Sequence, residues 1–326
     1  MDVKRILVPT DFSEESKMAL VFADIFIELF DCKVDVMHVI PLSDYLSDSF
    51  SSIGMPINMD DDVYPKLIEQ KKEELQKFAD EHIKNKKNKG NSIVKIDRKP
   101  SDAIAERASK EEYDLILMSA TGSHKSSLFH GSITDKIIRK SLVPVLTIPE
   151  SITGKDILKI LVPCDFSHHS MSALPIAFEI ADKFDAGIEV VHVIELFASD
   201  IHGVEPNTSG LAKKNVYESL VNEIARFLEE YPGKRLRIKR GDVDYFDEMV
   251  CEENGEETSV MFKVVITKSV TSHHEIIEYA NNESDLVVMS THGRTGLSHM
   301  LLGSTAEQVI KQVKKPQLTI KPDLDN

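Results

Sequence analysis

The chain has 326 residues, with 39 Lys and Arg against 54 Asp and Glu and a formal net charge of −15 at pH 7. A surface this acidic repels nucleic-acid backbones and anionic membranes, so we expect neither as a partner. Three scattered cysteines exclude a disulfide framework or a CxxC metal site, and with no signal segment and no long apolar run we expect a soluble, cytoplasmic protein.

The first half alternates short apolar runs with amphipathic stretches. The apolar runs Ile6–Val8, Val34–Ile40 and Leu115–Met118 predict strands that are buried on both faces. Helices are predicted between them, at Ser13–Phe30 with Ser13 and Ser16 as candidate caps of its start, at Lys66–Lys87 and at a segment that opens at Ser101. Residues 41–62 are rich in Ser, Asp, Gly and Pro and predict a loop. This order of strands and helices is typical of a parallel sheet with helices on both faces.

The chain repeats itself. The segment Ile6–Ser13 returns as Ile160–Ser167, and His38 returns as His192, both 154 positions later. The later run 114–119 returns 171 positions on, at 285–290, so the second copy carries about 17 extra residues. We therefore predict two domains, at 1–150 and 155–326, joined by a short linker.

The extra residues of the second copy fall within 197–257. Here the sequence predicts a long helix near Leu211–Tyr231 and an added strand or hairpin near Arg235–Arg240. An acidic stretch follows, and its Glu-rich run 252–257 is interpreted as a solvated loop.

The segment Met289–Ser304 has the composition of a phosphate-binding loop. It follows an apolar strand, contains several glycines and precedes a predicted helix at Thr305–Val313. Backbone N–H groups of such a loop can converge on phosphate oxygens, and the helix N-terminus adds about half a positive charge. Asp165 follows the first strand of this copy and Val193 lies near the end of its second, so both belong to the same carboxyl edge of the sheet.

At these residues the sequence resembles a known family. Ser290-x2-Gly293-x9-Gly303-Ser304 is similar to the Gly-x2-Gly-x9-Gly-[Ser/Thr] motif of ATP-binding universal stress proteins, with Ser in place of the first Gly. The Pro-Thr-Asp-Phe-Ser sequence that begins at Pro9 is also similar to the family. The resemblance covers both halves and implies a tandem member of the family.

For the fold, the resemblance implies two flavodoxin-like, Rossmann-like α/β domains. Each is expected to hold a five-stranded parallel sheet of order 3-2-1-4-5, flanked by helices. The final strands, near Val145–Ile148 and Leu318–Ile320, are expected to pair in an internal pseudo-dimer.

For the site, the resemblance implies that Asp165 and Val193 hold adenosine and that Gly293, Gly303 and Ser304 contact phosphates. The full set expected for the second domain is Pro163, Cys164, Asp165, Val193, Met289, Ser290, Gly293, Gly303, Ser304 and Thr305. The matching positions of the first domain are Pro9, Thr10, Asp11, Val39, Ser119, Gly122, Gly131 and Ser132. The first domain departs further from the motif, because eight residues rather than nine separate Gly122 from Gly131. We therefore expect the better site in the second domain.

Plainer interpretations stay open beside these. The glycines can simply end a strand and begin a helix, and Asp11 and Asp165 can satisfy backbone groups at a tight turn. His38 and His192 are interpreted as satisfied core or interface histidines, and Cys164 as a small buried thiol. The adjacent pairs His168-His169 and His273-His274 are interpreted as surface residues rather than metal ligands. His292 and Arg294 are expected either to touch phosphates or to face solvent.

The expected function is that of a stress-response or regulatory protein whose occupancy by ATP, or by ADP or AMP, changes its interaction with an unknown protein partner. Mg²⁺ is expected to accompany a triphosphate, although no dedicated carboxylate cage is visible in the sequence. Efficient catalysis is not expected, because Gly-Lys-[Ser/Thr], Gly-x-Ser-x-Gly and His-Glu-x-x-His are all missing. A slow ATPase, a nucleotide-free scaffold and further homodimerisation stay open as alternatives.

Overall fold

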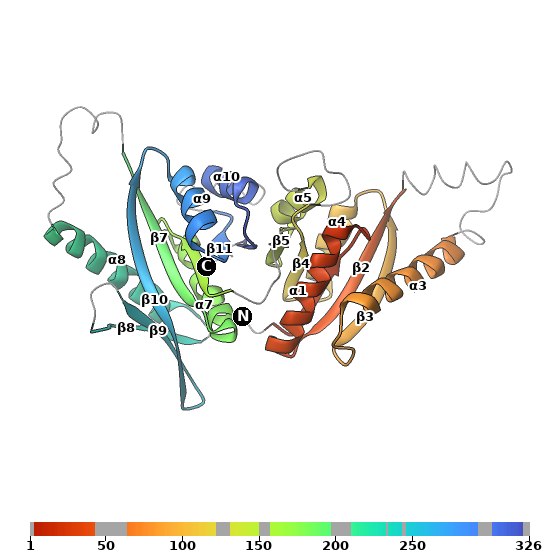
Figure 1. Cartoon of the computed structure of the whole chain (residues 1–326), viewed down its shortest axis with the longest axis horizontal. Coiled ribbons are helices and arrows are strands. Elements are labelled where there is room, and N and C mark those ends of the chain that lie inside the picture. The colour runs from red at the N-terminus through yellow and green to blue at the C-terminus, as the bar shows by residue number, and fades with distance from the viewer. Residues whose placement is uncertain are drawn as a thin grey trace. The chain divides into compact units, whose positions relative to one another are not determined.

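A computed structural model describes residues 3–42, 64–121, 131–149, 157–196, 210–232, 234–242, 246–292 and 302–321. By its internal contacts the chain divides into two compact units, Asp2–Lys155 and Asp156–Asn326, called here the N-terminal and the C-terminal unit (Figure 1). Among the described residues, no helix combines the length and the apolar character that a membrane crossing needs.

The N-terminal unit is a five-stranded parallel sheet with helices between its strands. Its elements are β1 (Arg5–Pro9), α1 (Glu14–Phe30), β2 (Lys33–Pro41), α3 (Tyr64–His82), β3 (Lys89–Asp97), α4 (Pro100–Lys110), β4 (Leu115–Ser119), α5 (Ser132–Lys140) and β5 (Val145–Ile148). The strands lie in the order β3-β2-β1-β4-β5, and every pair is parallel. This is the predicted order 3-2-1-4-5, so the predicted fold is confirmed here.

The C-terminal unit repeats this sheet and extends it. Its elements are β6 (Lys159–Pro163), α6 (His168–Met171), α7 (Leu174–Phe184), β7 (Gly187–Glu195), α8 (Gly210–Glu230), β8 (Arg235–Lys239), β9 (Asp247–Glu253), β10 (Glu256–Ser269), α9 (Ser272–Glu283), β11 (Leu286–Ser290), α10 (Ser304–Gln312) and β12 (Gln317–Ile320). Five parallel strands again have the predicted order, β10-β7-β6-β11-β12. The inserted residues add β9 and β8, which are antiparallel, beside β10.

The Glu-rich run 252–257 was wrongly predicted as a loop. It ends β9 and begins β10, and the turn between these strands is Asn254-Gly255, with φ values of 55° and 84°. Positive φ at both central residues is the geometry of a tight hairpin, which Asn-Gly favours. The run is exposed as expected, but it forms a hairpin.

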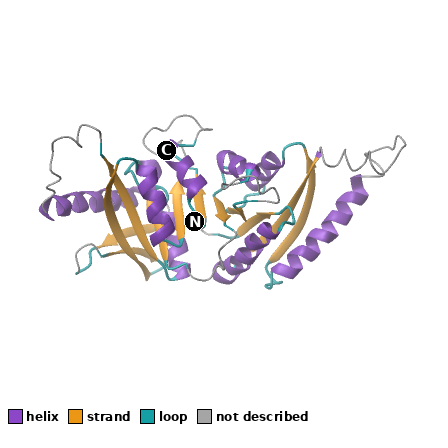
Figure 2. Ribbon diagram, turned by 45° about the horizontal axis from the view of Figure 1, so that its top comes forward, coloured by secondary structure: helices purple, strands orange, loops and turns teal. Residues whose placement is uncertain are grey.

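Helices cover both faces of each sheet (Figure 2). In the N-terminal unit α1 packs beside α3 and α4 packs beside α5, and in the C-terminal unit α9 packs beside α10. The inner strands β4 and β11 are buried along their whole length, because neighbouring strands and helices enclose them. The core is mainly aliphatic, with large buried rings at Phe22, Phe26, Phe178 and Phe262. Burial of such a core is the main favourable term in folding.

Local sequence signals account for several helix ends. Ser13 caps α1 as predicted, and its hydroxyl accepts a 3.2 Å hydrogen bond from the Ser16 N–H. The matching helix of the C-terminal unit is interrupted between α6 and α7, where Pro175 occupies the first turn of α7. The helix predicted to reach Lys87 ends at His82 instead. The pairing of the last strands of the two units stays a prediction.

Candidate functional site

The predicted site residues lie where neighbouring parallel strands end. In the C-terminal unit β6 lies between β7 and β11, so the ends of these strands, near Val193, Pro163 and Ser290, share one edge of the sheet. In the N-terminal unit β1 lies in the same way between β2 and β4. The carboxyl edge of an open α/β sheet is the usual place for a ligand.

Each aspartate at this edge belongs to a tight turn. Asp165 Oδ1 accepts hydrogen bonds from the Ser167 N–H at 3.0 Å and from the Ser167 hydroxyl at 2.6 Å. Asp11 Oδ1 accepts the same two bonds from Ser13, at 3.1 and 2.5 Å. The local role that the sequence left open is therefore present in both units, and a ligand-binding role remains a proposal.

The residue before each aspartate braces the same turn. The Thr10 hydroxyl lies 2.8 Å from the Ser16 hydroxyl and accepts a 3.1 Å bond from the Phe12 N–H. The Cys164 thiol takes this place in the C-terminal unit, 3.4 Å from the Ser170 hydroxyl. Cys164 is buried, which agrees with its interpretation as a small buried thiol.

The strand ends beneath the turns are apolar. Pro9, Pro163 and Met289 are buried, Val39 is buried and Val193 is half-buried. Apolar side chains at this level could contact a flat heteroaromatic ring at the strand ends. Of the two valines, Val193 in the C-terminal unit presents more surface for such a contact.

The serine that replaces the first glycine of the motif forms a hydrogen bond with the backbone two residues later in the chain. Ser290 is buried, and its hydroxyl accepts a 3.2 Å hydrogen bond from the His292 N–H. Ser119 is also buried and donates a 2.5 Å bond to the Thr121 carbonyl. In both units the serine therefore fixes the first residues after the strand.

The two phosphate-loop segments are closed by the same hydrogen bonds, although they differ in length. The Gly303 N–H donates to the Thr291 carbonyl at 2.9 Å, and the Gly131 N–H donates to the Ala120 carbonyl at 2.9 Å. Because both helix starts are fixed against their strands, the missing residue of the N-terminal unit falls between these fixed ends. Residues 122–130 and 293–301, which include Gly122, Gly293 and Arg294, lie outside the described part of the chain.

The helices that follow these segments begin without a side-chain cap from any described residue. Gly131 precedes α5 and Gly303 precedes α10, and neither N-terminus has a side-chain cap hydrogen bond. Ser132 and Ser304 are exposed in the first turn, and the half-buried Thr305 places its hydroxyl 3.4 Å from that of Ser272. Helix N-terminal N–H groups that lack a cap are suited to bind an anion.

Of the two positions expected for His292, exposure to solvent is wrong. Its side chain is 6% exposed, and Nδ1 lies 2.9 Å from the Thr291 hydroxyl, so it does not face solvent. The described residues contain no cluster of three or more His, Cys, Asp or Glu that could hold a metal ion.

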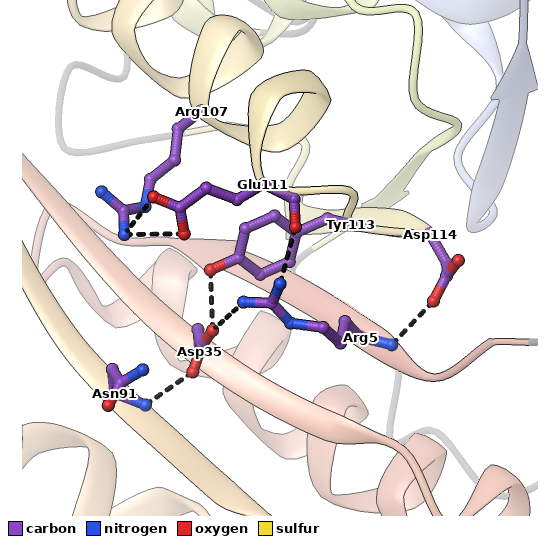
Figure 3. A network of polar contacts seen from close by, with 7 residues as sticks. All are labelled: Arg5, Asp35, Asn91, Arg107, Glu111, Tyr113 and Asp114. Carbon is purple, nitrogen blue, oxygen red and sulfur yellow. Dashed lines mark hydrogen bonds and ion pairs between the residues drawn. The ribbon is translucent and has the colours of Figure 1, made fainter.

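A second polar cluster lies at the opposite ends of the strands in the N-terminal unit (Figure 3). The buried Asp35 carboxylate accepts hydrogen bonds from the Asn91 N–H at 2.6 Å, the Tyr113 hydroxyl at 2.7 Å and the Arg5 guanidinium at 3.0 Å. Burial raises the pKa of Asp35, but these three donors outweigh it, so the pKa lies below its ordinary value. The sequence analysis missed this cluster, which lies far along the strands from the candidate site and is structural.

Comparisons with known proteins agree with this architecture. The model of the Universal stress protein family matches residues 2–149 and again 157–321. The chain is 27% identical over 338 residues to the universal stress protein E homolog of Haemophilus influenzae, which covers 99% of this chain and 98% of that protein. It is 32% identical over 164 residues to universal stress protein MJ0531 of Methanocaldococcus jannaschii, which covers 50% of this chain and 81% of that protein.

A solved structure extends the comparison to the fold. A universal stress protein from Archaeoglobus fulgidus DSM 4304 matches with a TM-score of 0.64 at 20% identity, over 98% of this chain and 99% of that one. The two family matches coincide with the two repeated sheets. The chain therefore belongs to the universal stress protein family, as a member with two family domains in tandem.

Proposed function

We propose that this chain binds an adenine nucleotide, with ATP as the first candidate, at the carboxyl edge of its sheets, and that the C-terminal unit holds the better site. The observation that carries the proposal is the environment of Gly303. Among the residues that the structure describes, a Cβ added there would meet nothing nearer than the Thr291 carbonyl oxygen at 3.5 Å, and the backbone φ is −59°. Neither packing against the described residues nor backbone conformation requires glycine at this position. Gly303 is the N-cap of α10, where Ser, Asp or Asn would cap the helix better, and close approach of a ligand to the backbone is the reason that we propose for the glycine.

The surrounding chemistry supports the same ligand class. The uncapped start of α10 suits phosphate, and Asp165 with the half-buried Val193 offers one carboxylate and one apolar surface for a nucleoside. Within the family, a universal stress protein has been crystallised in complex with cAMP. That finding concerns that protein, and the proposal for this chain rests on its own residues.

For the N-terminal unit we propose weaker binding. Its helix start is fixed by the same hydrogen bond, from Gly131 to Ala120, but its loop has one residue fewer. A shorter loop offers fewer backbone N–H groups to a triphosphate. Asp11 and Ser132 are both exposed, so a shorter phosphate chain would still find a carboxylate and a helix start.

We propose regulation by occupancy rather than efficient turnover, with Mg²⁺ carried on the phosphates. Binding would place a charged ligand at the carboxyl edge of the sheet and so change the surface that a protein partner meets. Phosphate release that follows substrate concentration and turns over many times per chain would contradict this part of the proposal. A slow ATPase would then be the better description.

The direct test is the nucleotide content of the freshly purified chain, measured by chromatography after heat denaturation, followed by calorimetric titration with ATP and MgCl₂. One nucleotide per chain supports a working C-terminal site with a degenerate N-terminal one. Two per chain would show that the shorter loop also binds. No retained nucleotide and no heat of binding would overturn the proposal in favour of a nucleotide-free scaffold.

A further inference from the structure

The turn that carries each aspartate holds an unusual backbone conformation. Phe12 follows Asp11 with φ of 63°, and Phe166 follows Asp165 with φ of 60°. A bulky residue in this left-handed region is strained, and such strain persists only where the surroundings enforce it. The same strained residue therefore stands beside the candidate ligand position in both units.

A histidine from the neighbouring strand contacts the residue before and the residue after the aspartate of each turn. His38 Nδ1 lies 2.8 Å from the Thr10 carbonyl oxygen, and the His38 ring lies 4.6 Å from the Phe12 ring. His192 makes the same two contacts in the C-terminal unit, at 2.9 Å with the Cys164 carbonyl oxygen and 4.8 Å with the Phe166 ring. A carbonyl can only accept, so Nδ1 must carry the proton and the tautomer is fixed.

The outer helix of each unit adds a further aromatic contact. Phe78 of α3 packs edge-on against Phe12 at 5.4 Å, and Phe227 of α8 packs edge-on against His168, just after the other turn, at 4.8 Å. Four residues after each of these phenylalanines stands another ring, His82 or Tyr231, at 4.8 or 5.3 Å. Edge-to-face ring pairs prefer defined geometries, so they restrict how the turn can move.

The two units have diverged around this arrangement while keeping it. Thr10 is replaced by Cys164, the continuous α1 is replaced by α6 and α7, and the loops after β4 and β11 differ in length. The spacing from aspartate to histidine is nevertheless 27 residues in both units. Both units also keep the hydrogen bond to the carbonyl, the ring contact and the left-handed φ. A histidine needed only to fill the core could be replaced by any residue of similar volume.

We infer that His38 and His192 are positioning residues: each holds the strained turn so that Asp11 or Asp165 is presented to the nucleoside part of a bound nucleotide. The inference rests on the proposed function and deepens it. The hydrogen bond fixes the carbonyl before the aspartate, and the ring holds the phenylalanine after it. The aspartate between them is thereby kept in place before the ligand arrives, which lowers the cost of ordering on binding.

The test compares two double variants of the full chain that change both units at once. His38→Asn/His192→Asn keeps an N–H donor where Nδ1 stands, whereas His38→Phe/His192→Phe keeps a ring but loses the donor. By titration with ATP, we expect the Asn variant to bind within about two-fold of the unchanged chain and the Phe variant about ten-fold more weakly. His274→Phe, on an exposed histidine of α9, is the matched control and should leave the affinity unchanged.

Amide hydrogen exchange provides a second readout that needs no ligand. The Phe variant should speed exchange at Phe12, Ser13, Phe166 and Ser167, whose N–H groups are hydrogen-bonded within the turns, and leave the strands protected. ATP affinity in the Phe variant equal to that of the unchanged chain, or an Asn variant as weak as the Phe variant, would overturn the inference. Faster exchange throughout both units would also overturn it, because the histidines would then be general core residues. If the unchanged chain binds no ATP, the proposed function fails, and the exchange at the turns still decides the role of the histidines.

Discussion

Gly90 lies so close to the carboxylate of Asp35 that a Cβ added to Gly90 would stand 1.9 Å from Asp35 Oδ1. The close approach occurs where the pairing of β2 with β3 shifts register between Val34 and Val36, so that Asp35 can accept from the Asn91 N–H. A bulge of this kind leaves backbone groups unpaired, and a side chain must satisfy them. Gly90 and Asp35 therefore act as one structural unit at the edge of the N-terminal sheet.

Gly90→Ala should destabilise the N-terminal unit by roughly 1–3 kcal/mol, because the added methyl displaces a buried, hydrogen-bonded carboxylate. Urea unfolding measures the effect, with the transition of each unit fitted separately. Gly187→Ala is the matched control, since a Cβ there would meet Met261 at an ordinary 3.6 Å, and its effect should stay within about 0.5 kcal/mol. If each variant shifted the unfolding midpoint of its own unit by the same amount relative to the unchanged chain, the Asp35 carboxylate would not occupy this position.

The Tyr113 hydroxyl makes stability depend on pH at both ends of the scale. Because the folded-state pKa of Asp35 is lowered, its contribution is present above the unfolded pKa of about 4 and is lost as the pH falls through the folded value. Burial and the bond to Asp35 raise the pKa of Tyr113 to about 12, so its contribution is present below about 10 and is lost as the pH rises through 12.

Tyr113→Phe should therefore cost roughly 1–3 kcal/mol near neutral pH, because it removes a bond to a buried charged group. The free energy of unfolding, followed from pH 3 to 11, should fall less steeply at both ends in the variant than in the unchanged chain. Titration of phenolate absorbance should lose a component near pH 12, whereas Tyr217 and Tyr279, whose pKa values are also raised by burial and a bond to a carboxylate, should titrate as before. A component near pH 12 that persists in the variant would show that it does not come from Tyr113.

The strands and the helix starts could be predicted from the sequence because they depend on local signals, whereas the sheet order was implied by the family resemblance. Continuous apolar runs marked the buried strands, and Ser13 marked the start of α1. The hairpin of β9 and β10 carried such a signal too, Asn254-Gly255, but it was hidden inside a Glu-rich run. The charged side chains of that run indicated exposure to solvent. Its backbone conformation depended on which strand it pairs with, and composition does not specify that.

The candidate site was harder to predict, because its important contacts join segments that lie far apart in the chain. The turns around Asp11 and Asp165 could be inferred because their hydrogen bonds join residues close in sequence. The contacts that His38 and His192 make with these turns depend instead on the register of two strands. Their one visible sign in the sequence was the equal spacing from aspartate to histidine in the two copies. His292 was expected to be exposed or bound to phosphate, whereas the structure buries it and places its Nδ1 2.9 Å from the Thr291 hydroxyl.

Substitution of Gly303 tests whether glycine there serves a ligand. Gly303→Ala should lower ATP affinity about ten-fold while costing less than about 1 kcal/mol of stability, since the fold leaves room for a Cβ. Gly303→Val should remove measurable binding by obstructing the phosphates. Gly131→Ala makes the same change at the other helix start and should affect total binding less. Unchanged affinity in the Val variant would remove Gly303 from the site.

The two aspartates allow the local role to be separated from the ligand role. Asp165→Asn keeps an oxygen that can accept from the Ser167 N–H and hydroxyl, so the turn and the unfolding midpoint should be preserved. The charge is lost, so if the carboxylate binds the nucleoside the ATP affinity should fall about ten-fold, as expected for one charge-assisted hydrogen bond. Asp165→Ala should lose both stability and affinity.

Asp11→Asn is the companion variant in the N-terminal unit, where the same turn exists and the phosphate loop is one residue shorter. Its effect on the total heat of ATP binding should be smaller than that of Asp165→Asn, because the C-terminal unit is proposed to bind more tightly. Equal effects would mean that the two units share the ligand equally and that the shorter loop is no handicap. An Asp165→Asn variant with full affinity would confine that aspartate to its turn and leave the helix start of α10 as the part of the site that holds the nucleotide.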